Sequence, residues 1–276
     1  MNWNELETDI FYKKENFTLL KGDTFELLDK FYPNTFNMIF ADPPYFLSGG
    51  GISCKGGKQV SVDKGKWDTS KDIFQKLEFH RLWISKCKRI LKENGTIWIS
   101  ATLHSVYAIG VALEMEGFSI INNVIWQKTN PTPNLACRAF THSTETILWA
   151  RKIIKKGKKG KHTFNYKQMK EANGNKQMKD VWSFGETDEI WALSTASKSE
   201  KKCGSHPTQK PLKLMDRIIL ASTNERDLIL DPFCGSGTTG ISAVRMNRNF
   251  VGIENEEEYL ELSKRRYEAE KNEKKF

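Results

Sequence analysis

An apolar strand, a glycine-rich turn and the start of a helix follow one another near the C-terminus, in DLILDPFCGSGTTG at residues 227–240. Gly235, Gly237 and Gly240 match the G-x-G-x-x-G pattern, whose glycines let the backbone approach a ligand closely at the end of a strand. The next apolar run ends at Glu254, where a carboxylate can accept hydrogen bonds from ribose hydroxyls. A nucleotide-like ligand is therefore predicted, and a glycine turn with a capping glutamate is the alternative interpretation.

The position of this turn restricts the topology of the fold. Residues 255–276, which follow Glu254, suffice for one helix, so the strands that complete the sheet must come from the N-terminal half. We therefore predict a circularly permuted, Rossmann-like α/β fold in which the strand Met38–Ala41 lies beside Leu228–Leu230. Because open α/β sheets bind ligands at the carboxyl ends of their strands, the residues after Ala41 are expected to face the cofactor.

The rest of the chain alternates between short apolar runs and amphipathic stretches, a pattern typical of a mostly parallel sheet with helices on both faces. Seven runs are predicted strands: Phe17–Leu20, Met38–Ala41, Thr96–Ser100, Ile120–Trp126, Thr146–Ala150, Leu228–Leu230 and Phe250–Ile253. Five stretches are predicted helices: one within residues 71–95, which Gly95 ends, and Ser105–Met115, Leu212–Ser222, Thr238–Met246 and Glu256–Lys271.

The residues around the glycine turn discriminate between nucleotide-like ligands. An anionic pyrophosphate favours basic groups or bare backbone amides, whereas Asp231, just before the turn, favours a cationic or zwitterionic ligand. S-adenosylmethionine is therefore favoured over NAD. A Walker A loop is excluded because no Gly-Lys-Ser/Thr follows the glycines.

The tetrapeptide Asp42-Pro43-Pro44-Tyr45 follows the strand that is expected beside the glycine turn. The two prolines restrict the backbone and leave carbonyl acceptors without N–H donors. The Asp42 carboxylate and the Pro43 carbonyl can together accept both hydrogens of an amino group, and Tyr45 offers an aromatic face for a base. An amine within a duplex is reached only when its base is flipped out or single-stranded. The tetrapeptide thus predicts methyl transfer to an exocyclic amine, with a plain rigid turn as the alternative.

Charge and cysteine content narrow the class of partner and the compartment. The net charge of +9 and the isoelectric point of about 9.2 indicate a polyanionic partner. The five cysteines form no Cys-x-x-Cys pair and the five histidines lack ligand spacing, so neither a disulfide framework nor a metal site is predicted. Without a leader-like N-terminus or a run of about 18 uncharged apolar residues, we expect a cytoplasmic protein that does not enter a membrane.

Two segments interrupt the alternation of strands and helices. Residues 46–67 are rich in Gly and Lys, which is typical of a flexible loop or of a lid that excludes water from a reaction. Residues 151–205 begin RKIIKKGKKGKH and later carry isolated aromatic residues. This composition favours a small module that contacts the partner over a solvated loop.

Taken together, the motifs resemble those of the β-class amino-methyltransferases of restriction-modification systems. DPPY precedes DPFCGSGTT, with HPTQKP between them at residues 206–211, and GTIWIS, IWQKTNPTPN and THSTETILWARK are similar as well. Within that class the chain is most similar to the GATC adenine methyltransferases of Dpn-type systems, which also accept single-stranded DNA. The resemblance implies a class I methyltransferase with a seven-stranded, mostly parallel sheet that contains one antiparallel strand.

With the residue arguments above, the resemblance assigns roles along this sequence. It places Asp42, Pro43, Pro44 and Tyr45 at the target adenine. The residues predicted at S-adenosylmethionine are Asp23, Asp42, Lys210, Asp231, Phe233, Gly235, Ser236, Gly237, Thr238 and Glu254. The residues predicted at DNA are Lys128, Asn134, Arg138, Lys155, Lys156, Lys158 and Lys159. Residues 1–150 are the implied catalytic half, 151–205 the target-recognition region and 206–276 the cofactor-binding half.

Several alternatives stay open at this level. The same geometry serves N4 of cytosine, although Asp42 stands where enzymes of that type commonly carry serine. A nucleic-acid-binding module with a vestigial cofactor fold is the other alternative. Cys234 is not a predicted nucleophile, because no histidine adjoins it in sequence. The expected partners are double-stranded DNA, single-stranded DNA as a further substrate, and a cognate restriction endonuclease that need not touch this chain; a homodimer is left open.

Overall fold

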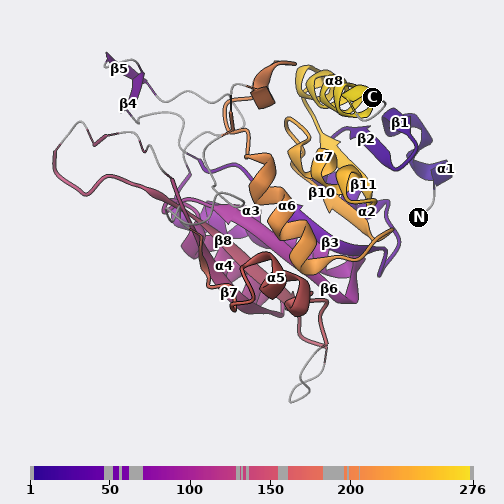
Figure 1. The fold of residues 1–276 in the computed structure, drawn as a ribbon, viewed down its shortest axis with the longest axis horizontal. Helices are drawn as coiled ribbons and strands as arrows, with labels where there is room; N and C mark the ends of the chain where they lie inside the picture. Colours follow the sequence, from indigo (N-terminus) through magenta and orange to yellow (C-terminus); the bar gives the residue numbers. More distant parts are fainter. Residues whose placement is uncertain are drawn as a thin grey trace.

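A computed structural model of the chain describes residues 3–46, 52–55, 58–61, 71–128, 131, 133–134, 137–154, 161–182, 196–197, 199–204 and 206–273. These residues form a nine-stranded sheet of order β1-β2-β11-β10-β3-β6-β8-β7-β9 (Figure 1). In that order the strands are Ile10–Lys14, Phe17–Lys21, Asn249–Glu254, Leu228–Asp231, Phe36–Ala41, Leu91–Ala101, Thr144–Lys152, Phe118–Gln127 and Val181–Trp182. A separate antiparallel hairpin joins β4 (Ile52–Lys55) to β5 (Lys58–Ser61).

All seven predicted strands are present, in the permuted arrangement that the C-terminal glycine turn requires. β10 pairs with β3 in parallel, and Leu230 lies opposite Ile39. The carboxyl ends of strands from the two halves of the sequence therefore meet. β8 is antiparallel to both of its neighbours, β6 and β7. The predicted α/β class I methyltransferase fold with a mostly parallel sheet is confirmed.

The sheet has nine strands rather than the predicted seven, because each edge carries one more. β1 pairs with β2 antiparallel and buries none of its residues fully. β9 consists of Val181 and Trp182 alone, beside β7. The apolar run of β1 is three residues long, Ile10–Tyr12, and β9 has two residues. Both runs are too short for the pattern that identifies buried strands.

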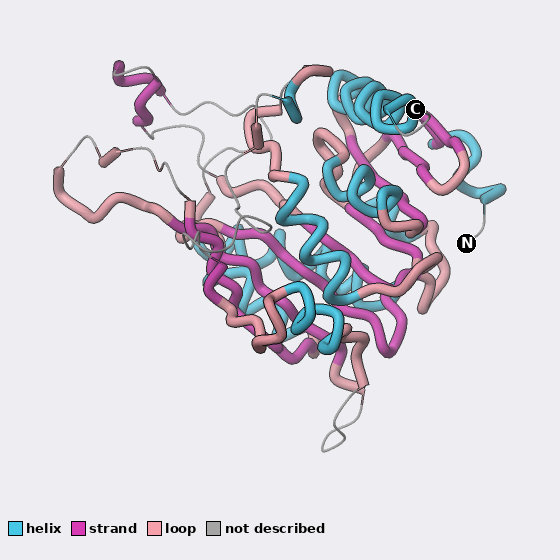
Figure 2. Tube along the Cα trace, in the orientation of Figure 1, coloured by secondary structure: helices cyan, strands magenta, loops and turns pink. Residues whose placement is uncertain are grey.

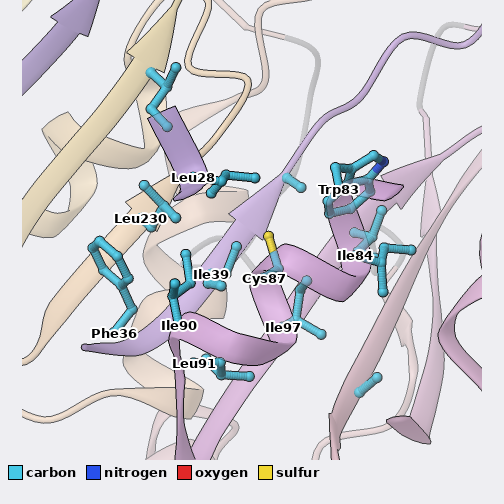
Figure 3. Packing of buried hydrophobic residues seen from close by; sticks show 14 of the residues in the cluster. Leu28, Phe36, Ile39, Trp83, Ile84, Cys87, Ile90, Leu91, Ile97 and Leu230 are labelled. Atoms are coloured by element: carbon cyan, nitrogen blue, oxygen red, sulfur yellow. The ribbon is translucent and has the colours of Figure 1, made fainter. Parts of the chain in front are cut away.

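Helices cover both faces of the sheet (Figure 2), because successive side chains of a strand point to opposite faces. In β3, Ile39 and Ala41 belong to one hydrophobic cluster and Met38 and Phe40 to the other. The helices of the first cluster are α2 (Thr24–Asp29), α3 (Ile73–Ile90) and α4 (Val106–Met115). Figure 3 shows Trp83, Ile84, Cys87 and Ile90 of α3 beside Ile39 and Ile97 of the sheet.

The second face is covered by helices from the C-terminal part of the chain. They are α6 (Leu212–Ser222), α7 (Thr238–Arg245) and α8 (Glu257–Glu273). Shorter helical segments are α1 (Trp3–Leu6), η1 (Glu7–Asp9), α5 (Tyr166–Ala172) and η3 (Ser199–Lys201). None of the helices in the described part of the chain has the length and apolar character that crossing a membrane requires.

The predicted helix within residues 71–95 ends before its glycine. Asp72 caps α3 by accepting a hydrogen bond from the backbone N–H of Gln75 at 2.8 Å, and the helix ends at Ile90. Gly95 lies within β6, where an added Cβ would be 2.7 Å from the carbonyl oxygen of Asn37 in β3. The glycine therefore permits close approach of two strands and is not a helix stop.

The described part of the 151–205 segment packs against the sheet and against α6. Trp182 is buried, with its ring centroid 6.3 Å from that of Trp98. The interpretation of these isolated aromatic residues as partner contacts is thus wrong for Trp182, whereas Phe164 and Tyr166 remain about half exposed. Residues 155–160 and 183–195 lie outside the described residues, as does all of the 46–67 loop except Phe46 and the hairpin β4–β5.

Candidate active site

A cavity of about 260 Å³ opens at the carboxyl ends of β3 and β10, where the permuted topology brings DPPY beside the glycine turn. All the predicted catalytic and cofactor residues except Gly237 line it. They are Asp23, Asp42, Pro43, Pro44, Tyr45, Lys210, Asp231, Phe233, Gly235, Ser236, Thr238 and Glu254. Residues from three distant parts of the sequence therefore share one site.

The glycine turn adopts backbone conformations that glycine reaches without strain. Gly235 and Gly237 have φ angles of 50° and 73°, in the left-handed region. A Cβ on Gly237 would lie 1.8 Å from Ser263 Oγ, and one on Gly235 would lie 3.2 Å from His206 Nε2. Gly237 does not line the cavity, but it caps α7 and lets the turn pass directly into the helix.

Glu254, at the end of β11, caps the turn, as the alternative interpretation of the glycine turn with a capping glutamate predicts. Its carboxylate accepts hydrogen bonds from the backbone N–H of Gly235 at 2.8 Å and from those of Asn255 and Glu256 at 2.9 Å. Burial raises the pKa of this carboxyl above its ordinary value despite these three donors. Glu254 therefore fixes the turn from the same position at which it lines the cavity.

Asp231 is almost completely buried at the end of β10. Its carboxylate accepts hydrogen bonds from Thr239 Oγ1 at 2.6 Å and from the backbone N–H of Phe233 at 3.1 Å. Burial raises the pKa of Asp231 to about 7, so this group titrates near neutral pH. Thr239 also lines the cavity. It is a site residue that the sequence reasoning missed although it belongs to the GSGTT motif.

Asp42 lies in a buried polar network at the end of β3. Lys210 Nζ is 2.5 Å from Asp42 Oδ2 and donates to the Tyr45 hydroxyl at 3.0 Å. The Tyr45 hydroxyl donates to Asp42 Oδ1 and lies 3.1 Å from Ser100 Oγ. Burial acts to lower the pKa of Lys210, but Asp42 and Tyr45 raise it well above its ordinary value. Lys210 is therefore a permanent ammonium ion beside Asp42.

Tyr45 has a different environment from the one that the sequence predicts. Its ring is only 4% exposed, and Lys210 Nζ lies 5.4 Å from the ring centroid. Burial raises the pKa of the Tyr45 hydroxyl well above its ordinary value, so the hydroxyl remains a donor to Asp42. In this structure Tyr45 orients Asp42. Stacking on a base requires the ring to become accessible and stays a prediction.

Asp23 lines the cavity as the N-cap of α2. Its carboxylate accepts hydrogen bonds from the backbone N–H groups of Phe25 at 2.8 Å and Glu26 at 3.2 Å. The rings of Phe25 and Phe79 pack edge to face at 5.4 Å, and both line the cavity. The sequence reasoning missed both phenylalanines, because neither belongs to a motif and α2, which carries Phe25, was not among the predicted helices.

The predicted DNA-contact residues differ in exposure and in their side-chain partners. Lys128 follows β7, and its Nζ lies 2.5 Å from Glu145 Oε1. Asn134 is partly buried and donates from its side chain to a backbone carbonyl of the same loop at 3.0 Å, whereas Arg138 is exposed. The remaining predicted contacts, Lys155, Lys156, Lys158 and Lys159, lie outside the described residues.

The charge of the cavity discriminates among cofactors. Among its described lining residues are five carboxylates and a single lysine: Asp23, Asp42, Asp231, Glu254, Glu256 and Lys210. This excess of carboxylates disfavours a pyrophosphate and suits a ligand with a sulfonium, an ammonium and ribose hydroxyls. The described residues hold no cluster of three His, Cys, Asp or Glu side chains that could bind a metal ion. Fold and site together define a class I methyltransferase that uses S-adenosylmethionine.

Comparison with known proteins identifies the family. Residues 36–265 match the family model described as DNA methylase. The chain is 57% identical over 265 residues to the type II methyltransferase M2.DpnII of Streptococcus pneumoniae, covering 96% of this chain and 94% of that protein. It is 56% identical over 261 residues to M2.LlaDCHI of Lactococcus lactis subsp. cremoris, covering 95% and 93%. The chain belongs to the DNA methylase family, and the predicted relationship to the Dpn-type methyltransferases of restriction-modification systems is confirmed.

Solved structures agree with the fold and the cofactor. The complex of M1.HpyAVI with S-adenosylmethionine is 28% identical, with a TM-score of 0.62 over 90% of this chain and 97% of that one. The cytosine-N4-specific PvuII DNA methyltransferase, at 18% identity and a TM-score of 0.70 over 93% and 88%, shows the fold alone. The protein is a site-specific DNA methyltransferase that uses S-adenosylmethionine, as the sequence predicts.

Proposed function

We propose that this protein methylates N6 of adenine within GATC sites of DNA. The observation that carries the proposal is the single cavity that the Asp42–Tyr45 segment shares with the glycine turn. A carboxylate at position 42 supports adenine, because N4-cytosine enzymes with this motif commonly carry serine there. The 57% identity to M2.DpnII supports the GATC site that the motifs themselves resemble.

S-adenosylmethionine supplies the electrophilic methyl group of its sulfonium when it is bound. The Asp42 carboxylate and the Pro43 carbonyl accept the two hydrogens of the target amine, so that the nitrogen lone pair faces the cofactor side of the cavity. Asp42 can also accept the proton that the nitrogen releases after transfer. Orientation supplies most of the rate acceleration, and no covalent bond to the enzyme is needed.

The cofactor roles follow the chemistry of the side chains. Glu254 accepts hydrogen bonds from the ribose, and Asp23 lies near the adenine of the cofactor. Lys210 has three N–H donors, of which Asp42 and Tyr45 take two. Glu145 Oε2 lies 3.7 Å from the same ammonium, and we assign the third donor to the methionine carboxylate when the cofactor is bound. The glycine turn forms the cofactor loop, whose residues are Phe233, Gly235, Ser236, Gly237 and Thr238.

The residues that we assign to DNA binding are chosen by their charge and by their position in the sequence. We assign base recognition to residues 151–205 and to the loop around Asn134–Arg138, and phosphate contacts to Lys128 and the lysines of 155–159. The target adenine is flipped out of a duplex or taken from single-stranded DNA. Methylation then protects cytoplasmic DNA from a cognate restriction endonuclease, with no contact between the two enzymes required. A homodimer stays a prediction.

Digestion of methylated plasmid tests site and base together. Unmethylated plasmid is incubated with the enzyme and S-adenosylmethionine and then cut with a panel of methylation-sensitive restriction enzymes. We expect protection from an enzyme that adenine methylation blocks at GATC and normal cutting at sites without GATC. Protection confined to other, cytosine-containing sites would favour transfer to N4 of cytosine, which the same amine-accepting geometry serves.

A further inference from the structure

Glu145 reaches the catalytic network from a strand that runs against its neighbours. Because β8 is antiparallel to β6 and β7, its first residues lie at the edge of the sheet where the parallel strands end. Glu145 is the second residue of β8 and pairs with Trp126, next to the end of β7. The sequence gives no sign of this, because Glu145 lies in the polar run THSTET, far from DPPY.

Glu145 lies between two lysines. Its Oε1 is 2.5 Å from Lys128 Nζ and its Oε2 is 3.7 Å from Lys210 Nζ. Lys210 in turn pairs with Asp42 at 2.5 Å. The four charges alternate in sign, and the side chains of Glu145, Lys210 and Asp42 are 11%, 6% and 15% exposed. At this depth a change in one charge is felt strongly by the next.

The row of charges links residues of two cavities that share no lining residue. Asp42 and Lys210 line the cofactor cavity. Glu145 and Lys128 line a second, polar cavity at the ends of β6 and β7, together with His142. Lys128 is also a predicted DNA contact. Glu145 therefore connects the side from which DNA is expected to approach with the carboxylate that receives the target amine.

An ammonium ion that pairs with one carboxylate neutralises the charge of that carboxylate. When the ammonium ion lies between two carboxylates, each carboxylate is neutralised less. We propose that Glu145 is a positioning residue for methyl transfer: it shares the Lys210 ammonium with Asp42 and thereby keeps the Asp42 carboxylate a strong acceptor for the target amine. This rests on the proposed role of Asp42. Without the Glu145 charge, Lys210 pairs with Asp42 alone, and Lys128 loses the partner that now balances it.

Isosteric substitution of Glu145 tests the proposal. Glu145→Gln removes the charge and keeps the size, and Glu145→Asp keeps the charge. The matched control is Glu15→Gln between β1 and β2, whose carboxylate is exposed in its ion pair with Lys271. Single-turnover transfer of labelled methyl groups is measured on unmethylated DNA of mixed sequence, together with calorimetric affinity for S-adenosylmethionine and the salt dependence of DNA binding.

We expect Glu145→Gln to lower the transfer rate about 10- to 100-fold while its affinity for S-adenosylmethionine stays within about threefold of wild type. DNA binding becomes tighter, and its salt dependence steeper by up to about one phosphate contact, because the Glu145 charge no longer offsets the contact of Lys128 with a phosphate. Glu145→Asp restores part of the rate, and Glu15→Gln behaves as wild type. The rate and the DNA affinity thus move in opposite directions, which a merely structural role does not produce.

A transfer rate of Glu145→Gln within about threefold of wild type would overturn the proposal. So would parallel losses of rate, cofactor affinity and thermal stability that Glu145→Asp does not repair. If Glu145→Gln does not fold, Glu145→Ser, which also removes the charge, decides: a reduced rate at unchanged cofactor affinity supports the proposal, and a wild-type rate contradicts it. The DNA contains every short site, so the wild-type enzyme methylates it whichever base or site it recognises. An error in the proposed base or site therefore appears in the wild-type product, and the rates of the variants can still be compared with that of the wild type.

Discussion

The cofactor side and the catalytic side of the cavity are held by different kinds of interaction. On the cofactor side, the Glu254 carboxylate accepts a backbone hydrogen bond from Gly235, and Gly237 adopts a left-handed conformation against Ser263. On the catalytic side, Asp42 is held by the charge of Lys210 and the hydroxyl of Tyr45. The first side is therefore sensitive to added volume, and the second to loss of charge without any change of shape.

Removal of the Asp42 charge is expected to have the largest effect on catalysis. Asp42→Asn keeps the shape of the side chain, yet we expect methyl transfer to fall about 10³-fold or more, because the acceptor for the amine is lost. The partly unpaired Lys210 lowers the free energy of unfolding by about 3 kcal/mol. Rapid-quench transfer assays and chemical denaturation measure the two effects.

The control for Asp42→Asn is Asp29→Asn, which removes an exposed ion-pair carboxylate of α2. Binding of S-adenosylmethionine by Asp42→Asn is expected to persist. Turnover above one tenth of the wild-type rate, with the cofactor bound normally, would contradict the role of Asp42.

Added volume is expected to damage the cofactor side next most strongly. Gly237→Ala brings a Cβ to 1.8 Å from Ser263 Oγ at a φ of 73°, so the turn must shift. We expect about tenfold weaker binding of S-adenosylmethionine and a loss of about 2 kcal/mol in stability. Calorimetry with the cofactor and thermal unfolding measure both.

Gly174→Ala is the matched control for Gly237→Ala. Gly174 has a φ of 60° but nothing within 4 Å of an added Cβ, so only the conformational cost of about 1 kcal/mol applies. Cofactor binding is expected to remain unchanged. Equal losses of cofactor affinity in the two variants would show that the contact with Ser263 does not matter.

On the cofactor side, the charge of Asp231 is expected to make the binding of S-adenosylmethionine depend on pH. Because the pKa of Asp231 is raised to about 7, this carboxyl is neutral at pH 6 and ionised at pH 8. We expect the affinity for the cationic S-adenosylmethionine to rise by up to about tenfold between these pH values, and Asp231→Asn to abolish the rise. Titration calorimetry at both pH values measures it, and a flat wild-type profile would place Asp231 away from the cationic groups.

The ionisation of Asp231 that raises cofactor affinity is expected to lower the free energy of unfolding of the protein without cofactor. A carboxyl whose pKa is higher in the folded than in the unfolded state stabilises the fold below its unfolded pKa, near 4, and this contribution is lost as the pH rises through about 7. The bound cofactor offsets that loss. Thermal unfolding at several pH values, with and without S-adenosylmethionine, checks the sign.

The smallest effect is expected at Cys234, in the middle of the glycine turn. Burial raises the pKa of this thiol well above its ordinary value, so it is neutral and unreactive. Cys234→Ala is therefore expected to keep transfer activity within about twofold. A loss of activity at normal cofactor affinity, seen in the same rapid-quench assay, would indicate a covalent role for this residue.

The sequence predicts most completely those features that depend on local pattern. Buried strands such as Met38–Ala41 carry continuous apolar runs, and the turn at Gly235 and Gly237 is specified by residues next to it. The edge strand β1 lacks a buried face, and Gly95 is explained only by its approach to β3. The strand β1 and the role of Gly95 depend on packing between segments that are distant in the sequence, which the periodicity of apolar residues does not describe.

The same distinction applies within the site. The members of DPPY and of the glycine turn are identified by their motifs, and the permuted topology correctly brings them together. Ser100 and Glu145 reach the polar network of Asp42 through contacts between distant segments. Thr239 reaches the site through its hydrogen bond to Asp231 across the glycine turn. The aromatic Trp182 is placed in the core for the same reason, because its contact with Trp98 joins residues far apart in the chain.

Direct methylation of the adenine amino group is tested most directly by mass analysis of nucleosides. DNA is methylated with S-adenosylmethionine that carries a deuterated methyl group and is then digested to nucleosides. We expect labelled N6-methyladenine from the wild-type enzyme and none above background from Asp42→Asn. Labelled N4-methylcytosine without N6-methyladenine would contradict the proposed acceptor.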